Sequence, residues 1–221
     1  MVFGACEEPS RRRLRVGCAG RKDWTSLRLV LSREPGDNDR MDDFRRLYLD
    51  EAFRSLRGHK RLADAAIAQL SDQELFAAPD AESNSVAVII KHLAGNMRSR
   101  FTDFLTSDGE KPDRHRDQEF IITPGATREE LLRSWEENWN LVFETLNSLH
   151  PEDLERTVPI RGEPHSVLRA INRQVAHYAY HVGQIVLLAK HWKAAEWKTL
   201  SVPRGQSEQY NAKRAQKHKN A

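Results

Sequence analysis

The sequence predicts an all-α protein, specifically a four-helix bundle, and two observations carry this prediction. Four segments repeat apolar residues at three- and four-residue steps over about 20 to 30 residues each, the spacing of an amphipathic helix. Beyond them, only the stretch from Arg156 to Ser166 alternates as a short β-hairpin does. Helices of up to about 40 Å with no second class of element beyond a hairpin are typical of a bundle.

Turn signals separate the four predicted helices. The third is marked most clearly, because Thr127 and Glu130 form a capping box at its start. Before it lies a long polar crossover with turn signals at Asp108-Gly109 and Pro124-Gly125, and loops of this length are often functional. The second helix can be capped by Ser83 or Asn84. The predicted helices cover residues 42–70, about 84–106, 128–149 and 167–193, and the crossover covers 107–126.

The chain is expected to hold one domain, residues 41–202, between two tails. Residues 1–40 are rich in Arg, Gly, Ser and Pro and lack a period, so we expect them to be disordered. Met41 follows at once and opens the first periodic segment, so a start of translation at Met41 is the competing interpretation of this extension. Residues 203–221 form a polar, basic tail.

Composition excludes several classes of function. The net charge is only +3 over 221 residues, and acidic and basic residues alternate along the helices, so no nucleic-acid partner is indicated. No apolar run approaches the roughly 20 residues that cross a bilayer, so no membrane partner is expected. The two cysteines, Cys6 and Cys18, lie outside the predicted domain, which agrees with a reducing cytoplasm.

Three histidines are candidate metal ligands. His177 and His181 stand four residues apart, so both side chains project from one face of the fourth helix, close enough to hold one ion. His92 lies among Val88, Ile89 and Leu93, whose burial would turn the same face of the second helix inward. The competing interpretation is three separate core histidines, each bonded to backbone or to a carboxylate.

The surrounding motifs resemble a known family. The run from His177 to Gln184, HYAYHVGQ, and the run from Ile90 to Met97, IKHLAGNM, resemble the DinB-like superfamily. More narrowly, segments 101–112 and 161–165 resemble an uncharacterised bacterial subfamily of it, and the likeness covers 41 to about 202. The resemblance implies a DinB-like bundle with a crossover between its second and third helices. It also implies one divalent ion on His92, His177 and His181, and a homodimer.

Three neutral nitrogen ligands leave positions open for water or substrate, as catalytic sites do. Zinc or nickel is the preferred ion, and manganese and iron are alternatives. The resemblance implies a metal-dependent enzyme acting on small molecules, with transfer of a low-molecular-weight thiol as the first choice and hydrolysis as the second. A non-catalytic metal- or ligand-binding protein of stress response is the alternative, and a structural dimer without metal is another.

Supporting residues can be nominated around the three histidines. Asn96 and Gln184 share helix faces with the ligands and can hydrogen-bond a ligand imidazole or a water, although helix amides often have no such role. Glu163 is a candidate acid or base, together with Asp103. Arg100 and Arg161 can line the mouth of a cavity with these two carboxylates, and solvated salt bridges are the competing interpretation.

Overall fold

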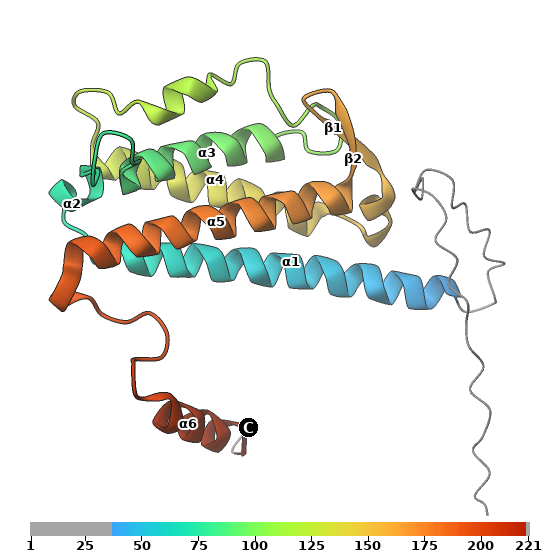
Figure 1. The fold of residues 1–221 in the computed structure, drawn as a ribbon. Helices are drawn as coiled ribbons and strands as arrows, with labels where there is room; N and C mark the ends of the chain where they lie inside the picture. The colour runs from blue at the N-terminus through green and yellow to red at the C-terminus, as the bar shows by residue number, and fades with distance from the viewer. Residues whose placement is uncertain (1–36, 220–221) are drawn as a thin grey trace, which may run out of the picture. The chain divides into compact units, whose positions relative to one another are not determined.

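Four long helices dominate the computed structural model, which describes residues 37–219 (Figure 1). They are α1 (Asp37–Ile67), α3 (Val86–Phe101), α4 (Arg128–Ser148) and α5 (Val167–Lys193). The expected disorder of residues 1–36 lies outside the described residues. Residues 37–40, which were expected to belong to the same tail, instead form the start of α1.

Shorter elements connect and follow these helices. They are α2 (Asp72–Phe76), the 3₁₀ turns Arg116–Phe120, Pro151–Glu155 and Ala194–Glu196, the strands β1 (Thr157–Ile160) and β2 (Glu163–Ser166), and α6 (Ser207–Lys219). The strands pair antiparallel, with Val158 opposite His165, and make the only sheet within residues 37–219. The all-α prediction is therefore confirmed, and so is the predicted hairpin. Helix α6 lies in the tail for which no helix was predicted.

Side-chain caps define where the helices begin. Ser85, rather than the predicted Ser83 or Asn84, caps α3 by accepting a hydrogen bond from the backbone N–H of Val88. At α4 the predicted capping box is present, because the Thr127 and Glu130 side chains each accept from the other's backbone N–H. Such caps satisfy N–H groups that the first helical turn leaves unpaired.

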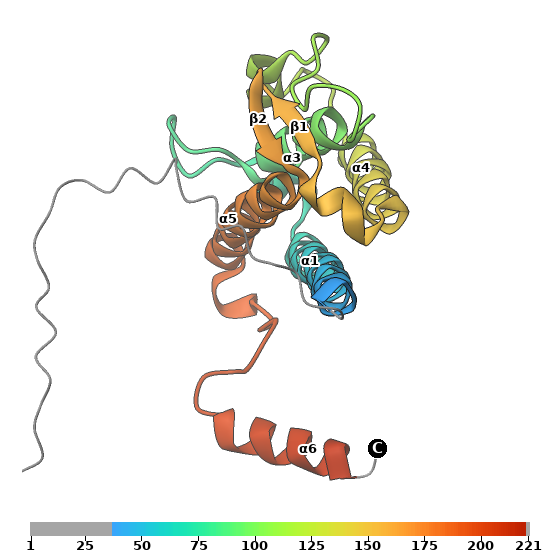
Figure 2. The ribbon, with the colours of Figure 1, turned by 90° about the vertical axis from the view of Figure 1, so that its right-hand side faces the viewer.

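The long helices pack in pairs around one core. Helix α1 runs along α5, α3 runs along α4, and α3 also contacts α5 (Figures 1 and 2). Trp139 and Tyr178, both fully buried, meet edge to face with ring centroids 5.5 Å apart, which ties α4 to α5. Trp135 donates from its ring nitrogen to Asp64 at 2.8 Å and so ties α4 to α1.

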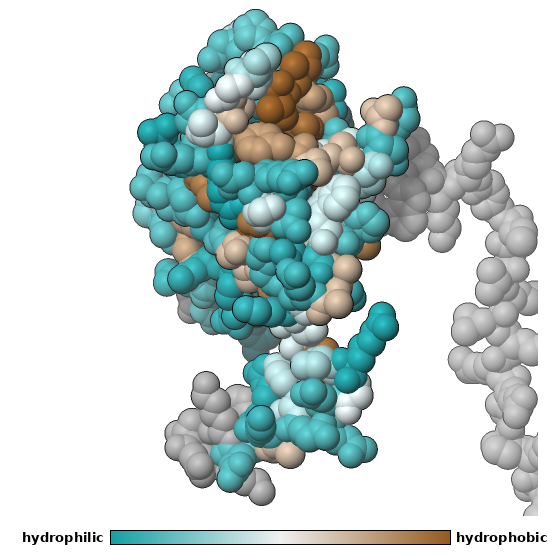
Figure 3. All heavy atoms as spheres, turned by 90° about the vertical axis from the view of Figure 1, so that its left-hand side faces the viewer, coloured by the Kyte–Doolittle hydropathy of each residue, from teal (hydrophilic) through white to brown (hydrophobic). Residues whose placement is uncertain are grey.

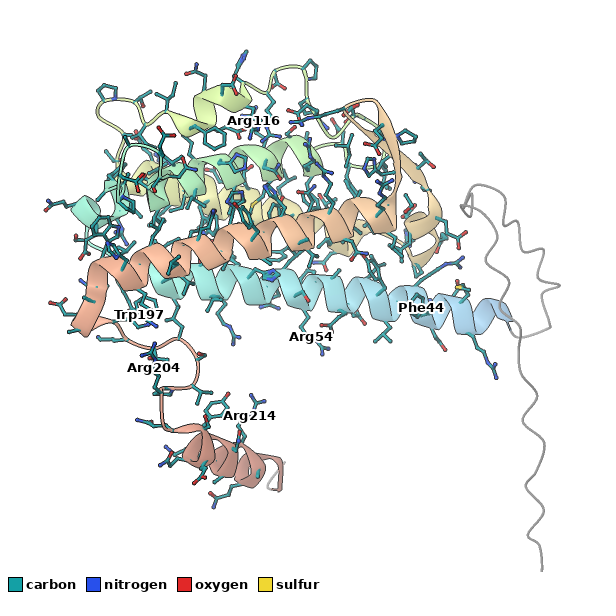
Figure 4. The ribbon with its side chains drawn as sticks, viewed as in Figure 1. Phe44, Arg54, Arg116, Trp197, Arg204 and Arg214 are labelled. Carbon is teal, nitrogen blue, oxygen red and sulfur yellow. The ribbon has the colours of Figure 1, made fainter. Side chains whose placement is uncertain are left out.

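The crossover between α3 and α4 passes over α3, where its 3₁₀ turn Arg116–Phe120 contacts that helix (Figure 1). Arg116 lies on this turn (Figure 4). Asp108 holds the start of the crossover to the hairpin, because its carboxylate accepts from the backbone N–H groups of Arg161 at 2.8 Å and Gly162 at 2.7 Å. Both turn residues, Arg161 and Gly162, have positive φ, as a two-residue loop of type I′ requires.

The surface is mainly polar, as the composition predicts. Hydrophilic residues cover most of the face shown in Figure 3, where the most hydrophobic residues form one patch near the upper edge and are otherwise scattered. No helix within residues 37–219 combines the length and the apolar character needed to span a membrane.

Candidate metal centre

His92, His177 and His181 lie together between α3 and α5. One ligand nitrogen from each lies within 4.8 Å of the other two. The Nε2 atoms of His92 and His177 are 3.5 Å apart. His92 and His181 are buried, whereas His177 is partly exposed. The predicted grouping of the three histidines is therefore present, and these side chains can hold one metal ion.

A carboxylate fixes the proton position on His92. Glu119, from the 3₁₀ turn of the crossover, places Oε2 2.8 Å from Nδ1 of His92. An ionised carboxylate only accepts hydrogen bonds, so the proton of a neutral His92 ring lies on Nδ1. The lone pair of Nε2 then faces His177 and His181, which is the state a metal ligand needs.

An amide does the same for His181. Its Nδ1 lies 2.7 Å from Oε1 of Gln184, and the amide nitrogen of Gln184 donates to the hydroxyl of Tyr180 at 3.1 Å. This pair of contacts sets the orientation of the amide, so Nδ1 of His181 is the donor and its Nε2 carries a lone pair. Gln184, a predicted supporting residue, thus orients the His181 imidazole, and its predicted catalytic role stays a prediction.

Electrostatics keep His177 and His181 neutral. Burial, followed by the proximity of His181, His92, Arg100 and Arg114, lowers the pKa of His177 to about 3. Burial also lowers the pKa of His181. Metal ligation requires unprotonated imidazole, so these rings are in the binding state at neutral pH without a proton having to leave.

One distance within the donor set fits a small divalent cation. Two nitrogens bound tetrahedrally at 2.0 to 2.1 Å from one ion are about 3.4 Å apart, close to the 3.5 Å between Nε2 of His92 and Nε2 of His177. A hydrogen bond between these two rings is the competing interpretation of the same distance. It requires the proton of His177 to lie on Nε2, whereas the ion requires a lone pair there.

Glu119 is itself held firmly. Arg114 donates a hydrogen bond to each carboxylate oxygen, from Nε to Oε1 at 2.8 Å and from Nη2 to Oε2 at 2.9 Å. Burial raises the pKa of Glu119, but the contacts with His92 and Arg114 outweigh it and leave the pKa below its usual value. Gly95 makes room on α3, because a Cβ there would lie 2.8 Å from Cδ of Glu119. The carboxylate therefore approaches His92 only because position 95 has no side chain.

An ion-pair network extends from this carboxylate along the crossover. Arg114 also donates to Glu110 at 3.2 Å, and Glu110 accepts from Arg100 at 2.8 Å and from Arg161 at 3.3 Å. Arg100 is buried and donates to the carbonyl of Gly109 as well. Arg100 therefore forms a salt bridge inside the protein. Of the two arginines predicted to line a cavity mouth, only Arg161 is exposed.

Two predicted catalytic residues make other contacts. Oδ1 of Asn96 accepts a hydrogen bond from the hydroxyl of the buried Tyr178 at 3.2 Å. Glu163 is exposed on β2, and its contacts within the described residues are with Arg169 at 3.5 Å and His165 at 4.0 Å. Catalytic roles for Asn96 and Glu163 therefore stay predictions, as does that of the exposed Asp103.

Sequence reasoning missed Glu119, the residue with the closest contact to His92. The crossover has no hydrophobic period, so no local pattern shows which of its carboxylates turns inward. The only available signals were the length of the loop and the presence of Gly95 within the second predicted helix. A helical glycine costs stability and suggests a close approach by another group.

The fold and the site define a helical protein with a three-histidine candidate metal centre. The chain belongs to a family described as "Protein of unknown function (DUF1572)", whose model matches residues 43–206. A search of curated proteins found no match, and a search of solved structures found none either.

Proposed function

We propose that this protein is a metal-dependent enzyme of the DinB-like class, built as a four-helix bundle, in which His92, His177 and His181 hold one divalent ion. One observation carries the proposal. The three imidazoles converge between α3 and α5, and Glu119 and Gln184 turn the Nε2 lone pairs of His92 and His181 toward the cluster. Metal-binding histidines characteristically have such partners on the other ring nitrogen.

The DinB-like assignment draws on the order of the elements. A long crossover links α3 to α4, one ligand comes from the second long helix, and two come from the fourth. This is the arrangement that the resemblance implies. The paired packing of α1 with α5 and of α3 with α4 is compatible with a bundle.

The proposed chemistry uses the positions that three protein ligands leave open. A divalent ion held there lowers the pKa of a thiol or water that binds it, so the nucleophile is available near neutral pH. We place transfer of a low-molecular-weight thiol first and hydrolysis second, with zinc or nickel as the ion. The ring of Phe120, 4.9 Å from that of His92, covers one side of this ligand and limits access of water.

A non-catalytic metal-binding role is the second candidate, and one observation favours it. Glu119, the carboxylate that contacts the cluster, already accepts from His92 and Arg114. It is thereby less suited to take a proton from a substrate. An enzyme would then depend on the ion itself for activation, or on a group that the substrate brings.

Elemental analysis of protein purified without an affinity tag tests the proposal. We expect about one equivalent of a transition metal in the wild type, its loss in His177→Ala, and its retention in His191→Ala, a matched change at an exposed position of α5. Absence of metal after reconstitution with zinc, nickel, manganese and iron would refute the site. Consumption of thiols by the metal-loaded protein, lost in His177→Ala, then separates the enzyme from the non-catalytic binder.

A further inference from the structure

A cavity lies between α3 and the crossover that follows it. It has a volume of about 440 Å³, is open on one side to solvent, and is lined by one face of α3, by Thr102 and Asp103, and by residues of the crossover between 111 and 119. Lys91, Gly95 and Arg98 contribute to the α3 wall, and Lys111, Arg114 and Glu119 contribute to the other. Pockets of about 300 to 1,000 Å³ commonly hold small organic molecules.

The acidic groups of this cavity are largely neutralised by their neighbours. Glu119 is paired with Arg114, as described above, and Asp113 faces Arg98 at 3.9 Å. Within the described residues, the carboxylate that remains in the wall without an arginine beside it is that of Asp103. The wall also contains two lysines, Lys91 and Lys111. Their two positive charges exceed the single negative charge of Asp103, so the lining is positive overall.

The two lysines retain unused donors. Nζ of Lys91 donates to the carbonyl of Ile121 at 2.6 Å, and Nζ of Lys111 donates to the carbonyl of Asp108 at 2.6 Å. An ammonium group has three donors, so each lysine keeps two that water or a ligand can take. Burial removes part of the hydration of the Lys111 ammonium and so lowers its pKa. An anion bound in the cavity would accept hydrogen bonds from the Lys111 ammonium in place of the lost water.

The cavity and the histidine cluster are separated by Glu119. This carboxylate lines the cavity and also contacts Nδ1 of His92, whereas Nε2 of His92 faces the other way, toward His177. We propose that the cavity is a second ligand site, for a small molecule that carries a carboxylate or a phosphate group, held by Lys91 and Lys111. This site is distinct from the three-histidine centre and does not depend on a metal being bound there.

Titration of the full chain by ¹H–¹⁵N NMR tests this second site. The probes are inorganic phosphate and succinate, with sodium chloride at matched ionic strength as the reference. We expect saturable shifts at the amides of Gly95, Ser99 and Lys111 with at least one probe, and whichever probe binds identifies the anionic group. Lys111→Gln should raise the dissociation constant about tenfold, because a charge-assisted hydrogen bond is lost. Lys190→Gln, an exposed change on α5, should leave it unchanged.

The same titration of His177→Ala separates this site from the metal centre. Binding that persists in His177→Ala supports the second site, even if the proposed metal function fails. Binding that disappears there places the anion on the metal and overturns the inference. It is also overturned if chloride produces equal shifts, or if Lys190→Gln weakens binding as much as Lys111→Gln does. Lys111→Arg keeps the charge and should retain binding, which guards against an effect of misfolding.

Discussion

Nδ1 of His92 and Oε2 of Glu119 lie 2.8 Å apart although 27 positions separate the two residues in the chain. The contact brings the crossover into the candidate metal centre, which the histidines alone would assign to α3 and α5. Since Arg114 holds both oxygens of Glu119, the crossover supplies the orienting carboxylate together with its counter-ion. Metal affinity should therefore depend on residues outside the long helices.

Removal of the Glu119 carboxylate should weaken metal binding. In Glu119→Ala, Nδ1 of His92 loses its acceptor and the ring is free to change tautomer, so we expect the metal dissociation constant to rise about 10- to 100-fold. Glu119→Gln should have a smaller effect, because its amide oxygen can still accept from Nδ1. Competition with a chelating dye measures both constants. An unchanged constant in Glu119→Ala, with the exposed Glu129→Ala as control, would contradict the orienting role.

Gly95→Ala should produce a similar weakening without altering any polar group. The new methyl group would lie 2.8 Å from Cδ and 3.2 Å from Cγ of Glu119, so the carboxylate must move away from His92. Gly58→Ala in α1 is the matched control, because nothing lies within 4 Å of its Cβ position. We expect Gly58→Ala to stabilise the protein by about 0.5 to 1 kcal/mol and to leave metal affinity unchanged. Equal affinities for the two variants would count against the steric argument.

The link between Asp108 and the hairpin should contribute stability that acid removes. Burial raises the pKa of Asp108, but backbone N–H groups of Glu110, Gly162 and Arg161 outweigh this, so the folded pKa lies below the ordinary value. A carboxyl group of this kind stabilises the fold fully above its unfolded pKa, and the contribution is lost as pH falls through the folded pKa.

Asp108→Ala should therefore lower the free energy of unfolding by about 1 to 2 kcal/mol at pH 7, and by less near pH 3. Urea unfolding at the two pH values measures the difference. A loss of the same size at both pH values would show that the ionised carboxylate is not the stabilising group.

Local patterns predicted the helices that local interactions define. The predicted segment 167–193 coincides with α5, and 128–149 differs from α4 by one residue at its end. Both have an apolar stripe and a side-chain cap, which are encoded within a few residues. The second helix was predicted to reach about Thr106, but α3 ends at Phe101, and Asp103 has a φ of 49° in the turns that follow.

The site was predictable only in part, for a related reason. The spacing of His177 and His181 on one helix is a local property, and His92 was nominated by its apolar neighbours on the second helix before the resemblance added its support. The contact from Glu119 depends on the path of the crossover, which is set by Asp108 at the hairpin and by Arg114 against Glu110 and Glu119. The contacts of Asp108 with Gly162 and of Glu119 with His92 join distant segments, and those of Arg114 lie within an irregular loop, so no periodicity in the sequence records them.

The pair formed by Asn96 and Tyr178 decides whether Asn96 is a structural or a chemical residue. Both side chains are buried, and Oδ1 of Asn96 accepts from the Tyr178 hydroxyl at 3.2 Å. Asn96→Ala leaves that hydroxyl without a partner and should cost about 1 to 3 kcal/mol of stability. In Tyr178→Phe the hydroxyl is absent, so adding Asn96→Ala should cost less than it does alone, because the two changes remove one shared interaction.

Denaturant unfolding of the four proteins in this cycle gives the coupling, and elemental analysis of each gives the metal content. If Asn96 is structural, the double variant should lose less stability than the sum of the two single losses. Every variant should then keep its full metal content. Additive losses of stability, together with a fall in turnover at unchanged metal content, would instead assign Asn96 to the chemistry. Because Tyr178 is adjacent to His177, metal loss in Tyr178→Phe alone would show that the hydroxyl also holds the ligand helix in register.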